Sequence, residues 1–290
     1  MIQARGLSKR FGDVHAVEDL TFDIRPDVVT GFLGPNGAGK STTLRLILGL
    51  DRPSAGTVTV AGRRYRDLAA PMREVGALLD ARAVHGKRSA RNHLRWLAQA
   101  GGLPVSRVDE VLEMVGLTDV AGRRIGGFSL GMSQRLGIAA ALLGDPGTLL
   151  FDEPVNGLDP EGIRWIRTLL RRLATEGRTV VVSSHLMHEM EATADHVLVI
   201  GRGRLIADTS MEDFTRRSAG HNVHVVSPDA AALRALLELA GGRVSDGADG
   251  DGTLAVDGLE AARVGDLAKD GLRVHELTPR ARAWRLRSWN

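Results

Sequence analysis

The residues most suited to chemistry lie at 34–42, in the stretch GPNGAGKST. From Gly34 to Ser41 they fit the spacing Gly-x-x-x-x-Gly-Lys-Ser in full. Glycines let the backbone turn so that its N–H groups point at a phosphate, and the start of a following helix adds partial positive charge. Lys40 is expected to reach the β- and γ-phosphates of a nucleotide, and the Ser41 hydroxyl to bind Mg²⁺. A simple tight turn would need neither side chain. The predicted nucleotide-binding loop comprises Gly34, Pro35, Asn36, Gly37, Ala38, Gly39, Lys40, Ser41 and Thr42.

A pair of acids follows a second apolar run, TLLFDEP at 148–154. Asp152 is expected to hold Mg²⁺ through water, and Glu153 to orient and deprotonate an attacking water at the end of a strand. A general base of this kind contributes on the order of 10² to 10⁴ in rate. The alternative is that the acids cap a helix, but the phosphate-binding loop upstream favours the catalytic interpretation.

The elements around these motifs alternate along the chain. VVTGFL before the loop and TLLF before the acids are continuous apolar runs that predict buried strands, while TTLRLILGL has helical spacing. This alternation predicts helices packed on a largely parallel sheet. The alternating pattern AVEDLTFDI near the N-terminus predicts a hairpin, and residues 85–145 include helical segments that predict an inserted helical subdomain.

The sequence pattern changes near residue 216. Residues 221–279 read as strand, helix, strand or hairpin, helix and strand, which predicts a small α+β unit of the split βαβ type, with a boundary in TRRSAGH. DGADGDG at 246–252 lacks the twelfth-position Glu of a calcium loop, so a hairpin tip is favoured over a metal site. The basic tail at 280–290 either touches lipid or a partner, or is disordered, and disorder is favoured.

Composition excludes several classes of protein. Of 290 residues, 43% are hydrophobic and 25% charged, as in a globular protein. Its apolar runs are shorter than the roughly 20 residues that span a bilayer, and no secretory signal is seen, so we expect a cytoplasmic chain. The net charge is +3, but the arginines are scattered among acids, so no specific nucleic acid is expected as a partner. With no cysteine, disulfides and thiolate chemistry are excluded.

Between the two motifs, GGFSLGMSQR at 126–135 resembles the signature of ATP-binding cassette (ABC) ATPases, whose usual form is Leu-Ser-Gly-Gly-Gln. Ser129 and Gly131 are kept, whereas Leu130 and Met132 depart from the common form. SLGM is similar to a variant seen in cassettes of antibiotic and lantibiotic exporters. The order of the motifs along the chain strengthens the resemblance.

Three further positions match the family, and a fourth, Asp80, departs from its Gln. NGLDP is similar to the D-loop, which places Asp159 at a subunit contact, and His185 after VVVSS matches the histidine that contacts the γ-phosphate. Phe11 stands where an aromatic residue stacks on adenine; the alternative is a core residue at a hairpin. Asp80 occupies the place of the Q-loop Gln, so it contacts Mg²⁺ or the attacking water, or touches only the transporter partner. His188 and Glu189 with His185 suggest a metal cluster, but an exposed helix face is favoured for them.

The resemblance covers residues 1–215 and implies an α/β fold. This fold is a P-loop NTPase core with an antiparallel β subdomain and the inserted helical subdomain, followed by the small C-terminal α+β domain. It implies that ATP and Mg²⁺ are bound between two copies arranged head to tail. The implied catalytic residues are Lys40, Glu153 and His185, the implied metal ligands are Ser41, Asp80 and Asp152, and the second copy contributes Ser129 and Gly131.

The resemblance also implies a partner. Since the chain shows no spanning segment of its own, the transport path belongs to an integral membrane permease, and the chain is expected at the cytoplasmic face of the cell membrane. The favoured function is the ATPase subunit of an exporter for a hydrophobic compound or antibiotic. Two alternatives stand: a cassette ATPase that acts on ribosomes or DNA, and an importer ATPase.

Overall fold

The computed structural model of the chain describes residues 1–218, 222–247, 252–269 and 271–280. Its internal contacts divide the chain into two units, Met1–Met211 and Glu212–Asn290. This division falls a few residues before the boundary predicted at 215–221. Residues 248–251 of the hairpin tip predicted at 246–252, and residues 281–290 of the tail predicted to be disordered at 280–290, lie outside the described residues.

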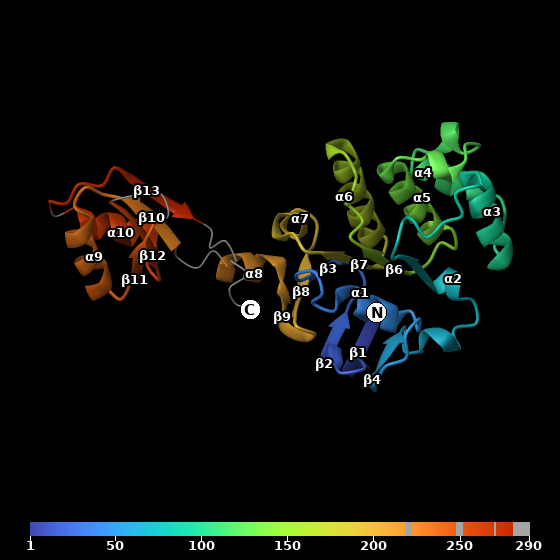
Figure 1. Ribbon diagram of the computed structural model, residues 1–290, viewed down its shortest axis with the longest axis horizontal. Coiled ribbons are helices and arrows are strands. Elements are labelled where there is room, and N and C mark those ends of the chain that lie inside the picture. Colours follow the sequence, from blue (N-terminus) through green and yellow to red (C-terminus); the bar gives the residue numbers. More distant parts are fainter. Residues whose placement is uncertain (219–221, 248–251, 270, 281–290) are drawn as a thin grey trace. The chain divides into compact units, whose positions relative to one another are not determined.

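The first unit is built on a six-stranded sheet in the order β5-β6-β7-β3-β8-β9 (Figure 1). Five of the strands run parallel, as the alternation in the sequence predicts, and β9 pairs antiparallel with β8. Strand β9 was not predicted, because its residues are at most half-buried and form no long apolar run. The strands are β3 Val29–Leu33, β5 Val75–Leu78, β6 Thr148–Asp152, β7 Thr179–Ser184, β8 His196–Gly201 and β9 Arg204–Ser210.

One face of this sheet is covered by helix α1, Lys40–Ile47, and by a three-stranded antiparallel sheet in the order β2-β1-β4. Phe32 of β3 and Leu150 of β6 point into this core and meet Leu44 of α1 and Leu20 of β2. Burial of such side chains is the main driving force for packing the two sheets onto α1. The antiparallel strands are β1 Ile2–Phe11, β2 Val14–Ile24 and β4 Ala55–Val60.

Helices cover the opposite face and one end of the sheet. Helices α6 and α7 pack on β3 and β7, while α3, α4 and α5 form the inserted helical subdomain beside β5 (Figure 1). Helix α5 approaches β5 closely, since a Cβ on Gly76 would lie 1.9 Å from the carbonyl oxygen of Ala141. The helices are α2 Pro71–Glu74, α3 Ala90–Ala100, α4 Arg107–Met114, α5 Leu130–Leu142, α6 Pro160–Thr175 and α7 Met187–Glu191, and the 3₁₀ turns are η1 Tyr65–Asp67, η2 Thr118–Val120 and η3 Ile125–Gly127.

The second unit contains a four-stranded antiparallel sheet in the order β11-β12-β10-β13, with two helices between its strands. This is the predicted split βαβ pattern, and its own core includes Val223, Val225, Leu233 and Leu237. Helix α8, Met211–Ser218, begins at the last residue of the first unit, and the remaining elements are β10 Asn222–Val226, α9 Ala230–Leu239, β11 Arg243–Asp246, β12 Thr253–Asp257, α10 Ala261–Ala268 and β13 Glu276–Arg280.

The predicted fold class, an α/β core with an antiparallel subdomain, a helical insertion and a small α+β unit, is confirmed. Within the described part of the chain, none of the helices combines the length and the apolar character that a membrane span requires.

Candidate nucleotide-binding and hydrolysis site

The glycine-rich loop lies between β3 and α1, at the carboxyl end of the parallel strands. Gly34 N–H donates to the carbonyl oxygen of Ser184, at 3.3 Å, which ties the loop to the end of β7. A Cβ on Gly34 would lie 2.3 Å from the carbonyl oxygen of Ile200. Gly39 has φ +106° and faces the carbonyl oxygen of Ala16, so no other residue fits there without strain. The loop therefore keeps its shape through backbone contacts that require glycine.

Lys40 is the first residue of α1 and only 5% exposed. Its Nζ donates to the carbonyl oxygens of Gly34 at 2.7 Å and Pro35 at 3.2 Å, so the side chain curls back over the loop. The same nitrogen lies 3.6 Å from Oε1 of Glu153. Burial lowers the pKa of Lys40, and the carboxylates of Glu153 and Asp152 oppose this shift.

The acidic pair stands at the end of β6, beside β7. The Ser183 hydroxyl donates to Oδ1 of Asp152. The same hydroxyl accepts a 3.0 Å hydrogen bond from the Glu153 N–H. Glu153 has φ +48°, a left-handed conformation that is uncommon for a residue other than glycine. The side chain of Glu153 is 19% exposed, so the pair lies in a partly enclosed position that water can reach.

His185 follows β7 directly. Its Nδ1 lies 3.0 and 3.1 Å from the two carboxylate oxygens of Glu153. Lys40, Glu153 and His185 therefore come together from the ends of β3, β6 and β7, which are neighbours in the sheet. The carboxyl ends of parallel strands are where open α/β sheets bind ligands.

The signature residues lie at the start of α5. Ser129 caps this helix by accepting from the Met132 N–H, at 3.2 Å, and leaves the helix start free to attract negative charge. A Cβ on Gly131 would lie 3.1 Å from the carbonyl oxygen of Gly157, so the signature contacts the segment before Asp159 in the same chain. Asp159 caps α6 through a 2.8 Å bond from the Gly162 N–H.

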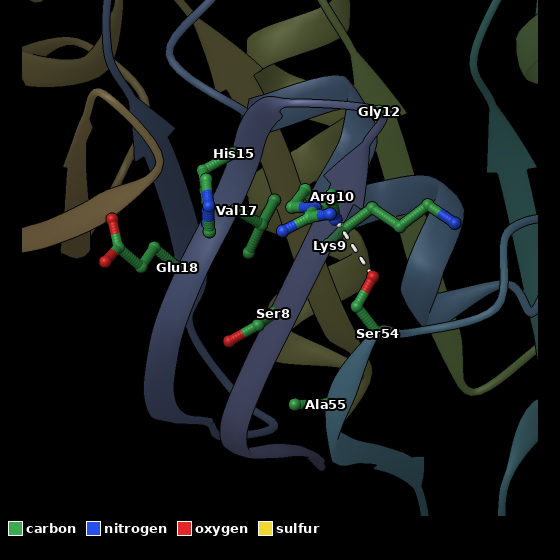
Figure 2. Close-up of a pocket in the computed structure, with 9 residues that line it drawn as sticks. All are labelled: Ser8, Lys9, Arg10, Gly12, His15, Val17, Glu18, Ser54 and Ala55. Atoms are coloured by element: carbon green, nitrogen blue, oxygen red, sulfur yellow. Dashed lines mark hydrogen bonds between the residues drawn. The ribbon is translucent and has the colours of Figure 1, made fainter.

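Phe11 ends β1 and is 49% exposed, and Lys9 Nζ lies 4.7 Å from the centre of its ring. A core position is therefore excluded for Phe11, and the exposed ring offers a face on which a base can stack. An open pocket of about 560 Å³ adjoins it, where the Arg10 N–H donates to the Ser54 hydroxyl (Figure 2). The pocket is lined by Ser8, Lys9, Arg10, Gly12, His15, Val17, Glu18, Ser54 and Ala55.

Known proteins share the sequence motifs of this site. The ABC transporter family pattern matches residues 17–156, and a pattern described as a domain of unknown function, DUF8746, matches residues 221–283. The chain is 38% identical over 221 residues to the bacitracin transport ATP-binding protein BcrA of Bacillus licheniformis, covering 75% of this chain and 72% of that protein. The chain belongs to the ABC transporter ATP-binding proteins.

Two further relatives bear on how such cassettes act. The Nod factor export ATP-binding protein I of Burkholderia orbicola (strain AU 1054) is 35% identical over 239 residues, covering 80% of this chain and 79% of that protein. The solved dimeric structure of a bacterial ABC transporter cassette superposes with a TM-score of 0.66 at 25% identity, covering 73% of this chain and 99% of that one. The same cassette has also been solved as a dimer in a post-hydrolysis state with ADP and phosphate. This chain is accordingly an ATP-binding cassette that hydrolyses ATP.

The donor set of the cassette suits Mg²⁺. Ser41 is exposed beside Lys40, and Asp152 presents a half-buried carboxylate. Hydroxyl and carboxylate oxygens with phosphate oxygens are the ligands that Mg²⁺ prefers, and it is usually held by one or two protein groups rather than by a complete cage. Among the residues that the structure describes, no group of three or more His, Cys, Asp or Glu could hold a metal by itself. When bound, Mg²⁺ would neutralise charge on the phosphates, with Ser41 and Asp152 as its protein ligands.

Asp80 follows β5 and is exposed, and its Oδ1 accepts from the Arg82 N–H at 2.8 Å. Its carboxylate therefore stabilises the turn after the strand, and its role toward Mg²⁺ or a transporter partner stays a prediction.

One expectation about the following helix is wrong. His188 is exposed as predicted, but Glu189 is buried, because its Oε2 accepts a 2.6 Å bond from the Ser184 hydroxyl. Ser184 also accepts from the Leu186 N–H at 3.0 Å, so Glu189 helps to shape the chain on either side of His185.

The sequence analysis also missed two side chains of the site. Ser183 bonds both acids, as described above, and Gln134 Nε2 donates to the carbonyl oxygen of Glu153 at 3.1 Å. Gln134 lies one turn beyond the signature, between the polar residues Ser133 and Arg135, so its place in the sequence gave no sign that it is buried.

Proposed function

We propose that this cassette is the ATPase subunit of an exporter for a hydrophobic compound or antibiotic, working as a head-to-tail pair on a separate membrane protein. The observation that carries the ATPase part of the proposal is the convergence of Lys40, Glu153 and His185 at the ends of three adjacent strands. Each of these side chains has a distinct part in cleaving the bond to the γ-phosphate.

Lys40 is placed to neutralise the β- and γ-phosphates, because its ammonium group already lies over the glycine-rich loop. Glu153 orients the attacking water and takes its proton, while the bond from the γ-phosphorus to the β,γ-bridging oxygen breaks and ADP leaves. His185, hydrogen-bonded to Glu153 through Nδ1, turns its other ring nitrogen toward the γ-phosphate. Phe11 supplies the face on which adenine stacks.

The pairing follows from where the signature lies. Gly131 lies beside Gly157 and Leu158 of its own chain, whereas Lys40 curls over the glycine-rich loop. A second copy, turned head to tail, brings its Ser129 and the start of its α5 to the γ-phosphate that the first copy holds. A related cassette has been solved as a dimer, which supports this arrangement. Hydrolysis removes the charge on which the two copies converge, so the pair separates and moves its membrane partner.

The names of two relatives support the proposed class of transported compound and the proposed direction of transport, which is export. One is named for bacitracin transport and another for Nod factor export. The SLGM form of the signature agrees with this group. The membrane partner is an integral permease, and the cassette is bound to it at the cytoplasmic face of the membrane.

The proposal is tested by identifying what binds the cassette in cells. A tagged Glu153→Gln chain, which holds ATP without cleaving it, should co-purify from detergent-treated membranes with one polytopic membrane protein. A tagged Lys40→Ala chain is the matched control and should retain less of it. Co-sedimentation with ribosomes or DNA instead would contradict the proposal. The wild-type cassette with this partner should lower cellular accumulation of the exported compound, and raised accumulation would identify an importer.

A further inference from the structure

The backbone of Glu153 is held from both sides by side chains of other elements. Ser183 of β7 accepts from its N–H at 3.0 Å, and Gln134 of α5 donates to its carbonyl oxygen at 3.1 Å. The Asn156 N–H donates to the same carbonyl oxygen at 3.2 Å, within the turn that follows. Both polar groups of this one peptide position are therefore fixed by hydrogen bonds that reach it from outside β6.

Glu153 needs such support because its backbone is in an unfavourable conformation. A residue with a side chain at φ +48° costs free energy, and it persists only where its surroundings impose it. This conformation sets the direction in which the carboxylate leaves the backbone, between Lys40 and His185. Releasing the carbonyl oxygen would let the peptide relax and move the carboxylate away from the attacking water.

Gln134 is suited to holding the Glu153 carbonyl, because the hydrogen bond offsets the free-energy cost of burying its amide. It is 5% exposed, and after Arg135 the helix continues with mostly apolar residues, Leu136–Leu142. A buried amide without a partner is unfavourable, so the bond to Glu153 accounts for a glutamine at this position. Gln134 also lies five residues after Ser129 on the same helix, so a shift of the helix start moves both residues together.

We infer that Gln134 is a positioning residue that links the two ATP sites of the cassette pair. Helix α5 places Ser129 at the ATP held by the second copy and Gln134 at the Glu153 that acts on the ATP held by its own copy. Binding of ATP to Ser129 at one site thus stabilises, through α5 and Gln134, the catalytic backbone conformation of Glu153 at the other site. This inference rests on the proposed head-to-tail pair.

The test replaces the amide donor without changing the size of the side chain. In the full chain with its membrane partner, Gln134→Met should lower kcat for ATP about tenfold, the effect of one lost hydrogen bond, with KM changed less than about twofold. The Hill coefficient for ATP should fall toward one. Gln99→Met, the same change at an exposed position of α3, is the control and should keep both values.

A double variant separates positioning from a general structural effect. If Gln134 acts through Glu153, then Gln134→Met should add less than about twofold to the loss in Glu153→Gln, measured with radiolabelled ATP in single turnover. A further tenfold loss in the double variant, or unchanged kcat in the single one, overturns the inference. Gln134→Glu, which is isosteric and lacks the N–H donor, gives the same test if the methionine variant does not fold. A wild-type chain that hydrolyses no ATP would instead count against the proposed function.

Discussion

Replacing Glu153 by Gln separates the assigned general base from every other contribution to the site. The substitution keeps the size of the side chain and removes its charge and its ability to take a proton. Loss of a general base lowers the rate by on the order of 10² to 10⁴, which is about 2.7 to 5.4 kcal/mol in the barrier. We therefore expect kcat for ATP to fall by this factor.

The same substitution has a smaller effect on folding. It weakens the contacts to His185 Nδ1 at 3.0 Å and to Lys40 Nζ at 3.6 Å. One charge-assisted hydrogen bond contributes about 1.5 to 3 kcal/mol, and the amide oxygen of Gln still accepts from the same donors. The decrease in the free energy of unfolding should therefore be smaller than the increase in the activation barrier for ATP hydrolysis, and the variant should remain folded.

The assay measures three quantities on one sample: kcat with saturating Mg²⁺ and ATP, ATP affinity, and mass in solution by light scattering. The variant should bind ATP as the wild type does and accumulate as a pair of chains, because the γ-phosphate persists. Glu191→Gln, the same change at an exposed position of α7, is the control and should leave all three quantities unchanged. A kcat for Glu153→Gln within twofold of the wild-type value would refute the assignment.

Three further outcomes follow from Lys40 and Phe11. Lys40→Ala removes a charged donor to the phosphates, so ATP affinity in equilibrium binding should fall about 10- to 150-fold, and unchanged affinity would contradict the predicted loop. Phe11→Ala removes the stacking face and should weaken ATP binding by about 1 to 3 kcal/mol; equal affinity for ATP and for triphosphate alone in the wild type would refute stacking. Burial lowers the pKa of Lys40 below its ordinary 10.5, so the folded chain binds fewer protons than the unfolded chain as pH rises toward that value. The free energy of unfolding of the wild type should therefore increase relative to Lys40→Met from neutral pH toward 10.5, and a constant difference in denaturant melts would contradict the shift.

The sequence predicted the parts of the cassette whose chemistry is local. The spacing from Gly34 to Ser41 and the apolar strand before it are enough for a phosphate-binding loop, because backbone turn, helix start and lysine are adjacent in the chain. The continuous apolar strands likewise predicted a parallel sheet. Both depend on neighbours in sequence, which a pattern can show.

What the sequence did not predict depends on contacts between distant elements. Gln134 and Glu153 are 19 residues apart, and Ser183 is 30 residues from Glu153. Glu189 looked exposed because a charged residue in a short helix normally is, and only its bond to Ser184 explains its burial. The half-buried strand β9 has no apolar run to mark it, because it is the last strand of its sheet and pairs within that sheet with β8 alone among the described strands.

The central claim is that two chains build each ATP site between them. It is tested most directly by a crystal structure of the Glu153→Gln chain with Mg²⁺ and ATP. The account predicts two copies related head to tail, with each γ-phosphate between Lys40 of one copy and Ser129 of the other. A structure in which a single copy encloses ATP with its own Lys40 and its own Ser129 would contradict it.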